Sequence, residues 1–335
     1  MWIVTGAAGF LGNVLVRELR ARGERVRAVL RSSIDPESLR GVDCERIQGD
    51  VLDAASLEQA FATPPGVTPI IVHAAGLVSI ERKVPLKVRE TNVEGTRNVI
   101  AASRKIPGAR LVYVSSVHAL PESTAGPIRE TLDIDPERVV GEYAKTKAIA
   151  TSLVLAASAP GADLDAVVVH PSGIIGPGDY GQGALTALVD SLVRGRLPFV
   201  VEGGYDFVDV RDLAGGIIDA ARFGCRGRNY ILSGGFHSIG ELSGIVSRAA
   251  DQRPRAAVPI WLARCSAPFA ELWAKITRTP ALFTSYSLHT LSSNGAFDHS
   301  RATSEFDYSP RPFDETIRDA VDWVRTRDQA AESAQ

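Results

Sequence analysis

Cysteine is scarce in this chain, which has three, Cys44, Cys225 and Cys265, among 335 residues. They are scattered and form neither a CxxC pair nor the spacing of a metal site. A small secreted domain held together by disulfides is therefore excluded, because such domains are dense in cysteine. We expect reduced, mostly structural thiols and no bound metal.

An excess of charge of one sign is also absent, since 37 Lys and Arg stand against 39 Asp and Glu. A nucleic-acid-binding protein would show a basic excess, so this class is not expected. No apolar run approaches the roughly 18–20 residues that span a bilayer. The N-terminus lacks the charged start and apolar stretch of a secretory signal. We expect a cytoplasmic protein without a membrane span, acting on a small molecule.

What the sequence has is alternation: short β-branched runs are followed by amphipathic segments. Strands are expected at 3–5, 26–30, 45–48, 70–73, 111–115 and 166–170, with shorter ones at 199–201, 207–210 and 230–232. Helices are expected at 11–23, 91–105 and 143–158. Such strand–helix alternation predicts the α/β class, with a Rossmann-type doubly wound parallel sheet.

After Pro171 this alternation stops, and the last hundred residues look mainly helical. We expect a Rossmann domain for NADP(H) over residues 1–171, with residues 207–235 returning to it. Residues 172–206 and 236–330 would form a smaller, mainly helical substrate-binding domain.

One apolar stretch, residues 259–276, carries two tryptophans. It is too short and too interrupted to span a bilayer. A core helix is the favoured interpretation; a lid over an apolar pocket and a membrane-touching helix remain open.

A glycine-rich turn, TGAAGFLG (5–12), joins the first strand to the first helix. Glycine permits a tight turn and lets the backbone approach a pyrophosphate, while the helix N-terminus offers unpaired N–H groups. The spacing is GxxGxxG rather than GxGxxG, and the alternative is a merely structural turn. In its strand–turn–helix setting the motif predicts dinucleotide binding. The expected contacts are Gly6, Gly9, Phe10, Leu11 and Gly12.

The second strand ends at Arg31, flanked by Ser32 and Ser33. A carboxylate there would favour NAD, whereas a guanidinium can pair with a 2′-phosphate and stack on adenine. We therefore expect NADP(H) to be preferred and NAD(H) to remain usable. The alternative is that Arg31 points to water and either cofactor binds.

Two further strand ends carry cofactor candidates. Asp50 is placed to accept a hydrogen bond from the adenine amino group, with Val51 beside the ring. Ala74, Ala75 and Gly76 are small, so the cofactor can lie against the backbone there.

The segment EYAKTK places Tyr143 and Lys147 four residues apart on one helical face, and a strand ends just before Ser116. Reducing a carbonyl builds negative charge on oxygen, which must receive a proton. A phenol with a pKa of about 10 is a poor acid–base group until a neighbouring ammonium lowers that pKa. Ser116 would hydrogen-bond the same substrate oxygen, and Ser115 is the alternative serine. The sequence predicts a proton-transfer site.

These motifs together resemble the extended short-chain dehydrogenase/reductase superfamily, the NAD-dependent epimerase/dehydratase family. Within it, AVLR (28–31) and SSVHALPE (115–122) look most like the dihydroflavonol 4-reductase/3β-hydroxysteroid dehydrogenase group. The resemblance covers nearly the whole chain. It rests on TGAAGFLG (5–12), TNVEGTRNVI (91–100), LVYVSSVHA (111–119), YAKTK (143–147), HPSGIIGPGD (170–179), FVDVRDLAGGIIDA (207–220) and YSPRPFDETIRDAVDW (308–323).

The resemblance implies roles for individual residues. Tyr143 is the acid–base residue and Lys147 its partner. Asn92 matches the family's active-site asparagine, which orders a water or the helix; an ordinary helix-start cap is the alternative. Pro171 and Ser172 lie in the segment that passes the nicotinamide. A homodimer through the active-site helices is also implied.

Three functions remain open. The first is an NAD(P)(H)-dependent reductase or dehydrogenase of an apolar, steroid- or flavonoid-like ring compound. The second is a nucleotide-sugar epimerase or dehydratase with tightly held NAD, in which Arg211 could bind a diphosphate. The third is a non-catalytic redox sensor or scaffold that binds NADP(H). Packing roles are favoured for His73, His118 and Tyr205, although the last two could touch substrate.

Overall fold

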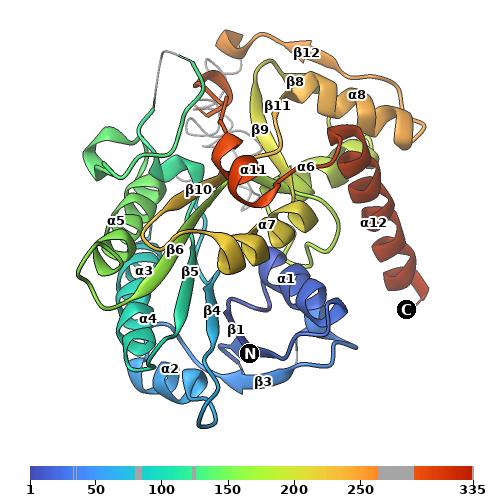
Figure 1. The fold of residues 1–335 in the computed structure, drawn as a ribbon. Coiled ribbons are helices and arrows are strands. Elements are labelled where there is room, and N and C mark those ends of the chain that lie inside the picture. Colours follow the sequence, from blue (N-terminus) through green and yellow to red (C-terminus); the bar gives the residue numbers. More distant parts are fainter. Residues whose placement is uncertain (33, 35, 80–84, 123–125, 263–289, 334–335) are drawn as a thin grey trace.

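The computed structural model describes residues 1–32, 34, 36–79, 85–122, 126–262 and 290–333, with side chains to residue 327 (Figure 1). Most of the apolar stretch 259–276, with Cys265, lies outside the described residues, as does Ser33. The predictions made for them are not addressed by the structure.

A seven-stranded parallel sheet forms the centre of the molecule, in the order β10-β6-β5-β4-β1-β2-β3. The predicted α/β class and doubly wound sheet are confirmed. The reversal of strand order at β1 and β4 creates the crevice at which ligands of such sheets bind. The strands are β1 (Trp2–Thr5), β2 (Val26–Leu30), β3 (Glu45–Gln48), β4 (Ile70–His73), β5 (Arg110–Val114), β6 (Asp165–Pro171) and β10 (Asn229–Leu232).

Helices cover both faces of this sheet (Figure 1). In β1, Trp2 and Val4 belong to one apolar core, and Ile3 belongs to the core on the opposite face. Successive side chains of a strand point to opposite faces, so a continuous apolar run is what a sheet covered on both sides requires. The first core includes α1 (Phe10–Ala21) and α7 (Val210–Phe223); the second includes α2 (Ala54–Phe61).

The two longer helices predicted from the sequence, at 91–105 and 143–158, differ in regularity. The helix α5 (Glu142–Ala157) is continuous, close to its predicted range. The helix expected over 91–105 begins earlier and is not uniform: α3 (Leu86–Arg89) leads into a π-helical stretch, Glu90–Glu94, which continues as α4 (Gly95–Arg104). Such π segments inside helices are frequent at functional sites, because the extra residue redirects a side chain.

The C-terminal half adds two small sheets to the main one. One sheet holds β7 (Gly173–Ile175), β9 (Gly204–Asp209) and β11 (Phe236–Ser238); the other pairs β8 (Phe199–Val201) with β12 (Ala256–Val258). The described helices of this half besides α7 are α6 (Ala184–Val193), α8 (Ile239–Ala249), α11 (Ser300–Phe306) and α12 (Phe313–Ser333). Of these, α11 joins the core of the main sheet through Ala302 and Phe306.

The strand predicted over 207–210 is displaced, because it begins at Gly204 and ends at Asp209. The carboxylate of Asp209 accepts a hydrogen bond from the backbone N–H of Arg211 at 2.8 Å. Asp209 therefore caps helix α7, and Val210 becomes its first helical residue. Among the described residues, no helix has the length and apolar character needed to cross a membrane. The division into two domains remains a prediction.

Candidate active site

The turn between β1 and α1 leaves no room for a side chain at Gly6 or at Gly12. The backbone of Gly6 has a φ of 70°, and a Cβ there would lie 2.6 Å from the nitrogen of Ala75. A Cβ on Gly12 would lie 2.1 Å from the carbonyl oxygen of Gly6. Gly9 donates its N–H to that same oxygen at 2.9 Å. The glycines at 6 and 12 are therefore required by geometry.

The asparagine that follows this turn holds the surrounding loops together. The amide nitrogen of Asn13 donates to the carbonyl oxygens of Gly9, at 2.9 Å, and Gly178, at 3.1 Å. The carbonyl oxygen Oδ1 of Asn13 is buried and has no hydrogen-bond partner among the described residues. The N–H groups of Phe10, Leu11 and the next residue begin helix α1, where they have no intrahelical acceptor. A backbone cradle at a helix N-terminus fits a dinucleotide pyrophosphate.

The ends of β2 and β3 lie side by side. Gly49 donates its N–H to the carbonyl oxygen of Leu30 at 2.9 Å, so Arg31 and Asp50 follow neighbouring strand ends. Arg31 is an exposed residue. One carboxylate oxygen of Asp50 accepts from the N–H of Leu52 at 2.9 Å. The two candidates therefore lie on neighbouring loops at the carboxyl edge of the sheet.

Val51 is buried and has a structural role that its sequence position did not indicate. A Cβ built on Gly95 would lie 2.8 Å from a methyl group of Val51. The valine therefore packs against the first turn of α4. This contact fixes the loop that carries Asp50.

The two adjacent serines at the end of β5 have different partners. The hydroxyl of Ser115 lies 2.6 Å from that of Thr151, whose own hydroxyl bonds the carbonyl oxygen of Lys147 at 2.7 Å. The hydroxyl of Ser116 instead accepts a hydrogen bond from the N–H of His118 at 3.2 Å. Ser115 is engaged in packing α5 against the sheet, which leaves Ser116 as the serine able to donate to a substrate oxygen.

Helix α5 carries the predicted acid–base pair. Tyr143 and Lys147 are both buried, at 8% and 6% exposure. The Lys147 ammonium donates to the carbonyl oxygen of Val114 at 2.8 Å and lies 5.1 Å from the centre of the Tyr113 ring. Burial lowers the pKa of Lys147 to about 8. At neutral pH this amine is still mostly charged, and its charge is directed at the sheet end.

The Lys147 ammonium and the Asn92 side chain both lie close to Gly76. A Cβ built on Gly76 would lie 3.5 Å from Nζ of Lys147 and 3.3 Å from Oδ1 of Asn92. A side chain at position 76 would therefore crowd both groups. Ala74, Ala75 and Gly76 follow directly from the end of β4.

Asn92 does not cap a helix start; that alternative is wrong. It lies inside the π-helical stretch and is 2% exposed. Its side chain accepts from the N–H of Leu77 at 2.8 Å and donates to the carbonyl oxygen of Leu77 at 3.0 Å. A further bond of 3.1 Å reaches the hydroxyl of Thr146 on α5. Asn92 thus ties the loop after β4 to the helix that carries Tyr143.

The histidines of the sequence analysis lie in two environments. His73 is fully enclosed, 2.9 Å from the hydroxyl of Thr5 and 3.2 Å from that of Thr96, and burial lowers its pKa to about 3. His118 has its Nε2 2.9 Å from the hydroxyl of Tyr205, with the two rings stacked. His73 is therefore enclosed by packing, while His118 and Tyr205 form one aromatic pair beyond Ser116.

Arg211 is already neutralised by carboxylates. Its Nε and Nη2 donate to Asp209 at 2.9 and 2.7 Å, and its Nη1 lies 2.7 Å from a carboxylate oxygen of Asp319. All three guanidinium nitrogens are engaged, so a diphosphate would have to displace two ion pairs. The structure does not favour Arg211 as a diphosphate ligand.

Pro171 ends β6 and Ser172 follows it, 6% exposed. The hydroxyl of Ser172 is buried at the sheet end and donates a hydrogen bond to the carboxylate of Asp206.

One residue near the site was missed by the sequence analysis. The imidazole of His170, the residue before Pro171, lies 2.9 Å from the carbonyl oxygen of Ser116. The segment HPSG was noted only for its passage along the cofactor. A polar residue in an otherwise apolar central strand was the available signal.

Comparison with known proteins agrees with this geometry. The sequence profile described as the NAD dependent epimerase/dehydratase family matches residues 2–232. This confirms the family resemblance that the motifs indicated.

Among the curated relatives that cover nearly the whole chain are proteins of Methylococcus capsulatus and Stigmatella aurantiaca. One, the "Sterol demethylase protein B" of Methylococcus capsulatus, is 32% identical over 329 residues, which is 97% of this chain and 98% of the relative. Another, from Stigmatella aurantiaca, is 30% identical over 350 residues, 99% of this chain and 97% of the relative. It is named 4-hydroxy-2-methyl-3-oxo-4-farnesyl-3,4-dihydroquinoline-1-oxide ketoreductase.

The fold is matched by a solved structure. The crystal structure of gox2253 superposes with a TM-score of 0.83 at 30% identity and covers 98% of both chains. The described architecture is therefore that of an experimentally known protein along almost its full length.

Proposed function

The chain belongs to the NAD-dependent epimerase/dehydratase family and is an oxidoreductase of the extended short-chain dehydrogenase/reductase type, and from this premise we propose that it interconverts a ketone and a secondary alcohol. The substrate is an apolar, ring-containing compound of steroid- or flavonoid-like character, and NADP(H) is the preferred cofactor. The observation that carries the proposal is that Lys147, one helical turn from the buried Tyr143, lies beside Gly76 and donates to the carbonyl oxygen of Val114 at the end of β5, two residues before Ser116.

The residues of the cradle and the sheet ends would hold the dinucleotide. The bound cofactor supplies the hydride and accepts it in the reverse direction. These residues are Gly6, Gly9, Phe10, Leu11, Gly12, Arg31, Asp50, Val51, Ala74, Ala75, Gly76, Tyr143, Lys147, Pro171 and Ser172.

Proton transfer is the task of the chain itself. Tyr143 donates its phenolic proton to the substrate oxygen as negative charge builds there, and it recovers a proton from solvent afterwards. Lys147 lies one helical turn away and lowers the pKa of the phenol by its positive charge. Ser116 donates a hydrogen bond to the same substrate oxygen. Asn92 keeps α5 in register with the loop after β4 through its bonds to Leu77 and Thr146.

The apolar substrate is supported by two observations. Two of the relatives that match along nearly the whole chain are named for a sterol and for a farnesyl dihydroquinoline oxide. In addition, Arg211 is engaged by Asp209 and Asp319, so the strongest diphosphate candidate of the sequence is occupied. The second candidate function is a nucleotide-sugar epimerase or dehydratase, which the family profile also includes.

The preference for NADP(H) rests on Arg31, an exposed cation at the carboxyl end of β2. We expect Arg31→Asp to weaken NADPH binding about tenfold or more while NADH binding changes little, because a carboxylate repels the 2′-phosphate. The matched control is Arg25→Asp, which alters an exposed arginine at the opposite end of the same strand. Equal changes in NADPH and NADH affinity for Arg31→Asp would rule out this residue as the phosphate reader.

The proposed function is tested by a cofactor titration of the purified protein. We would record the absorbance spectrum as isolated and then titrate with NADPH and NADH, following nicotinamide fluorescence. Cofactor-free protein that binds NADPH more tightly, and then oxidises it with a ketone from a steroid and flavonoid panel, supports the reductase. Protein that is purified with NAD bound and does not exchange it for added cofactor would instead indicate the epimerase or dehydratase.

Three further expectations accompany the proposal. The chain would act in the cytoplasm, and it would form a homodimer through the helices α4 and α5. Residues 172–206 and 236–330 would enclose the substrate, with the remainder binding the cofactor. Light scattering of the purified protein measures the dimer directly, and a monomer at micromolar concentration would contradict it.

A further inference from the structure

The imidazole of His170 is buried between the catalytic edge of the sheet and the C-terminal part of the chain. It is 0% exposed, and its Nδ1 lies 2.9 Å from the carbonyl oxygen of Ser116. The same oxygen accepts the N–H of Ala119 at 3.0 Å. A carbonyl oxygen has two lone pairs, so both acceptor positions of Ser116 are used. The peptide plane that carries the Ser116 side chain is thereby fixed from two directions.

On the other side, the imidazole contacts Asn229 of β10. The amide nitrogen of Asn229 lies 3.3 Å from Nε2 of His170 and donates to the carbonyl oxygen of Thr131 at 2.8 Å. The amide oxygen of Asn229 accepts from Nη1 of Arg301 at 3.2 Å. A guanidinium only donates and a carbonyl oxygen only accepts, so these two partners determine which end of the amide is which.

The orientation of Asn229 determines the tautomer of His170. Because the amide presents N–H toward Nε2, this ring nitrogen must be an acceptor without a proton. The proton of the neutral ring then resides on Nδ1, where it is donated to the carbonyl oxygen of Ser116. An imidazolium would place two donors against each other at Nε2. Burial, with the charges of Lys147 and Arg301, lowers the pKa of His170 to about 4, although the bond to Ser116 opposes this.

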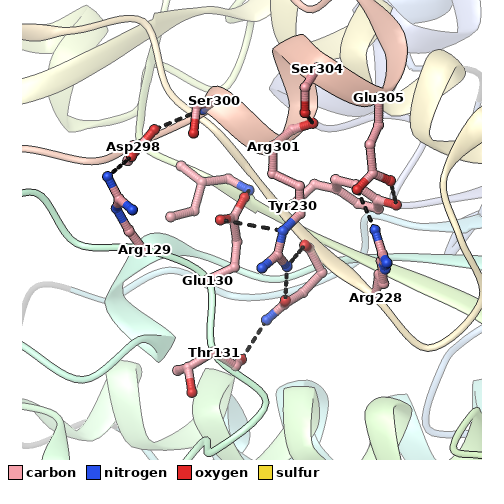
Figure 2. A network of polar contacts seen from close by, with 12 residues as sticks. Arg129, Glu130, Thr131, Arg228, Tyr230, Asp298, Ser300, Arg301, Ser304 and Glu305 are labelled. Atoms are coloured by element: carbon pink, nitrogen blue, oxygen red, sulfur yellow. Dashed lines mark hydrogen bonds and ion pairs between the residues drawn. The ribbon is translucent and has the colours of Figure 1, made fainter.

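The arginine that orients the amide is itself held in place. Arg301 extends from α11, and its Nη1 also donates to the backbone oxygen of Asn229 at 2.9 Å. Its Nε lies 3.8 Å from a carboxylate oxygen of Glu130, whose side chain is 5% exposed. The other carboxylate oxygen of Glu130 accepts the N–H of Ile231 at 2.9 Å. Figure 2 shows Arg301 reaching from its helix toward Glu130 and Thr131.

We propose that His170 is a positioning residue for Ser116, and that Asn229 and Arg301 set its tautomer so that Nδ1–H faces the serine carbonyl. The line of contacts runs from α11, near the C-terminus, through β10 and β6 to the end of β5. It explains why a histidine stands in a central strand whose other residues from Ala166 to Val169 are buried and apolar. The part of the inference that concerns turnover rests on the proposed reductase function.

The tautomer is tested without turnover, by ¹⁵N nuclear magnetic resonance of the histidine side chains in the full-length protein near pH 7. The His170 signals are identified by their loss in His170→Asn, and His237→Asn, which changes a partly exposed imidazole, is the assignment control. We expect a protonated Nδ1 and an unprotonated Nε2 at His170. The opposite tautomer, or a ring titrating near pH 6.5 as a free imidazole does, would overturn the inference whether or not a substrate is known.

The positioning role is tested by two substitutions of His170. In His170→Asn the side-chain amide can still donate near the position of Nδ1, whereas His170→Leu cannot donate. We expect His170→Leu to lower kcat about 10- to 100-fold with KM and the NADPH dissociation constant within about threefold, because a displaced catalytic group costs rate rather than affinity. His170→Asn should recover most of that loss.

The two variants also separate positioning from packing. If both variants lose thermal stability equally and their kcat values do not differ, His170 is only a packing residue and the inference fails. If His170→Leu does not fold, the tautomer measurement and the kcat of His170→Asn still decide whether His170 positions Ser116. In that case a 10-fold or larger loss of kcat in His170→Asn, with a normal NADPH dissociation constant, would contradict the proposal.

Discussion

The two sides of the crevice at the sheet's carboxyl edge are built in different ways. On the side of β1 and β4, the site is made of backbone: a Cβ on Gly12 or Gly6 would lie 2.1 or 2.6 Å from a main-chain atom. On the side of β5 and β6, the site is made of side chains, among them Ser116 and Lys147, whose positions depend on hydrogen bonds to other elements.

This difference has a physical consequence for what each side tolerates. A backbone cradle leaves no room for added atoms, so a substitution that adds a side chain disrupts it by steric overlap. A side-chain site keeps its fold when one hydrogen bond is lost, but it loses the orientation of a reacting group. The first side is therefore expected to lose binding and stability together, and the second to lose turnover with binding retained.

The largest effect is expected from Gly12→Ala, on the backbone side. The added methyl would overlap the carbonyl oxygen of Gly6, so the turn must open, at a cost of about 3 kcal/mol or more. We expect NADPH binding to disappear in the fluorescence titration, with a lower urea midpoint. Gly240→Ala is the matched control, since a Cβ at this helical glycine of α8 would lie no closer than 3.7 Å to another residue. Unchanged NADPH binding and stability in Gly12→Ala would show that the cradle is not sterically closed.

A loss of comparable size, confined to turnover, is expected from Tyr143→Phe on the other side. Without the phenolic proton, kcat should fall about 10³-fold, within the range for general acid–base catalysis. The dissociation constant for NADPH and the urea midpoint should stay close to wild type. Tyr180→Phe, at a phenol that is 39% exposed, serves as the control. Undiminished turnover in Tyr143→Phe would remove this residue from the mechanism.

A smaller and more discriminating effect is expected at the two adjacent serines. Ser116→Ala should lower kcat about 10- to 100-fold with little change in stability, because a hydrogen bond to the reacting oxygen is lost. Ser115→Ala should cost about 1 kcal/mol of stability and little kcat, because its bond of 2.6 Å to Thr151 only packs α5. Urea denaturation and steady-state rates of both variants measure this. The reverse pattern would exchange the roles of the two serines.

The smallest effect concerns pH and the two enclosed imidazoles. Burial lowers the pKa of His170 to about 4 and that of His73 to about 3, from an ordinary 6.5. Below about pH 6.5 these imidazoles are protonated in the unfolded chain but not in the folded chain. The free energy of unfolding therefore falls as the pH drops from about 6.5 toward the lowered pKa values. Each residue contributes up to about 1.4 kcal/mol per pH unit.

Urea unfolding between pH 7 and 5 measures this slope. We expect His170→Asn to reduce this slope, because the variant removes an imidazole whose pKa is lowered by folding. A slope that His170→Asn does not alter would mean that this imidazole is protonated as readily in the folded chain as in the unfolded one.

The sheet and the cofactor-binding turn were predictable from the sequence because local pattern determines them. Apolar runs marked most of the strands, although the edge strand β3 is polar, and β2, β3, β4 and β8 have their predicted bounds. Glycine spacing marked the turn before α1, since steric exclusion at Gly12 involves residues only a few positions away.

The polar contacts that hold the catalytic edge could not be predicted in this way. His170 meets Ser116 across 54 residues and Asn229 across 59, and neither separation leaves a periodic signal. The π-helical stretch around Asn92 is likewise set by a tertiary contact, the bonds to Leu77. Choosing between Ser115 and Ser116 required the position of Thr151.

The most direct test of the central claim is a single-turnover reaction with NADPH carrying deuterium at the transferred position and an excess of a ketone from the panel. The account predicts that one equivalent of NADP⁺ forms and that the released alcohol carries one deuterium on its carbinol carbon. It also predicts that Tyr143→Phe, although saturated with NADPH, is about 10³-fold slower. Protein that oxidises no NADPH with any ketone, yet epimerises or dehydrates a nucleotide sugar while retaining NAD, would contradict it.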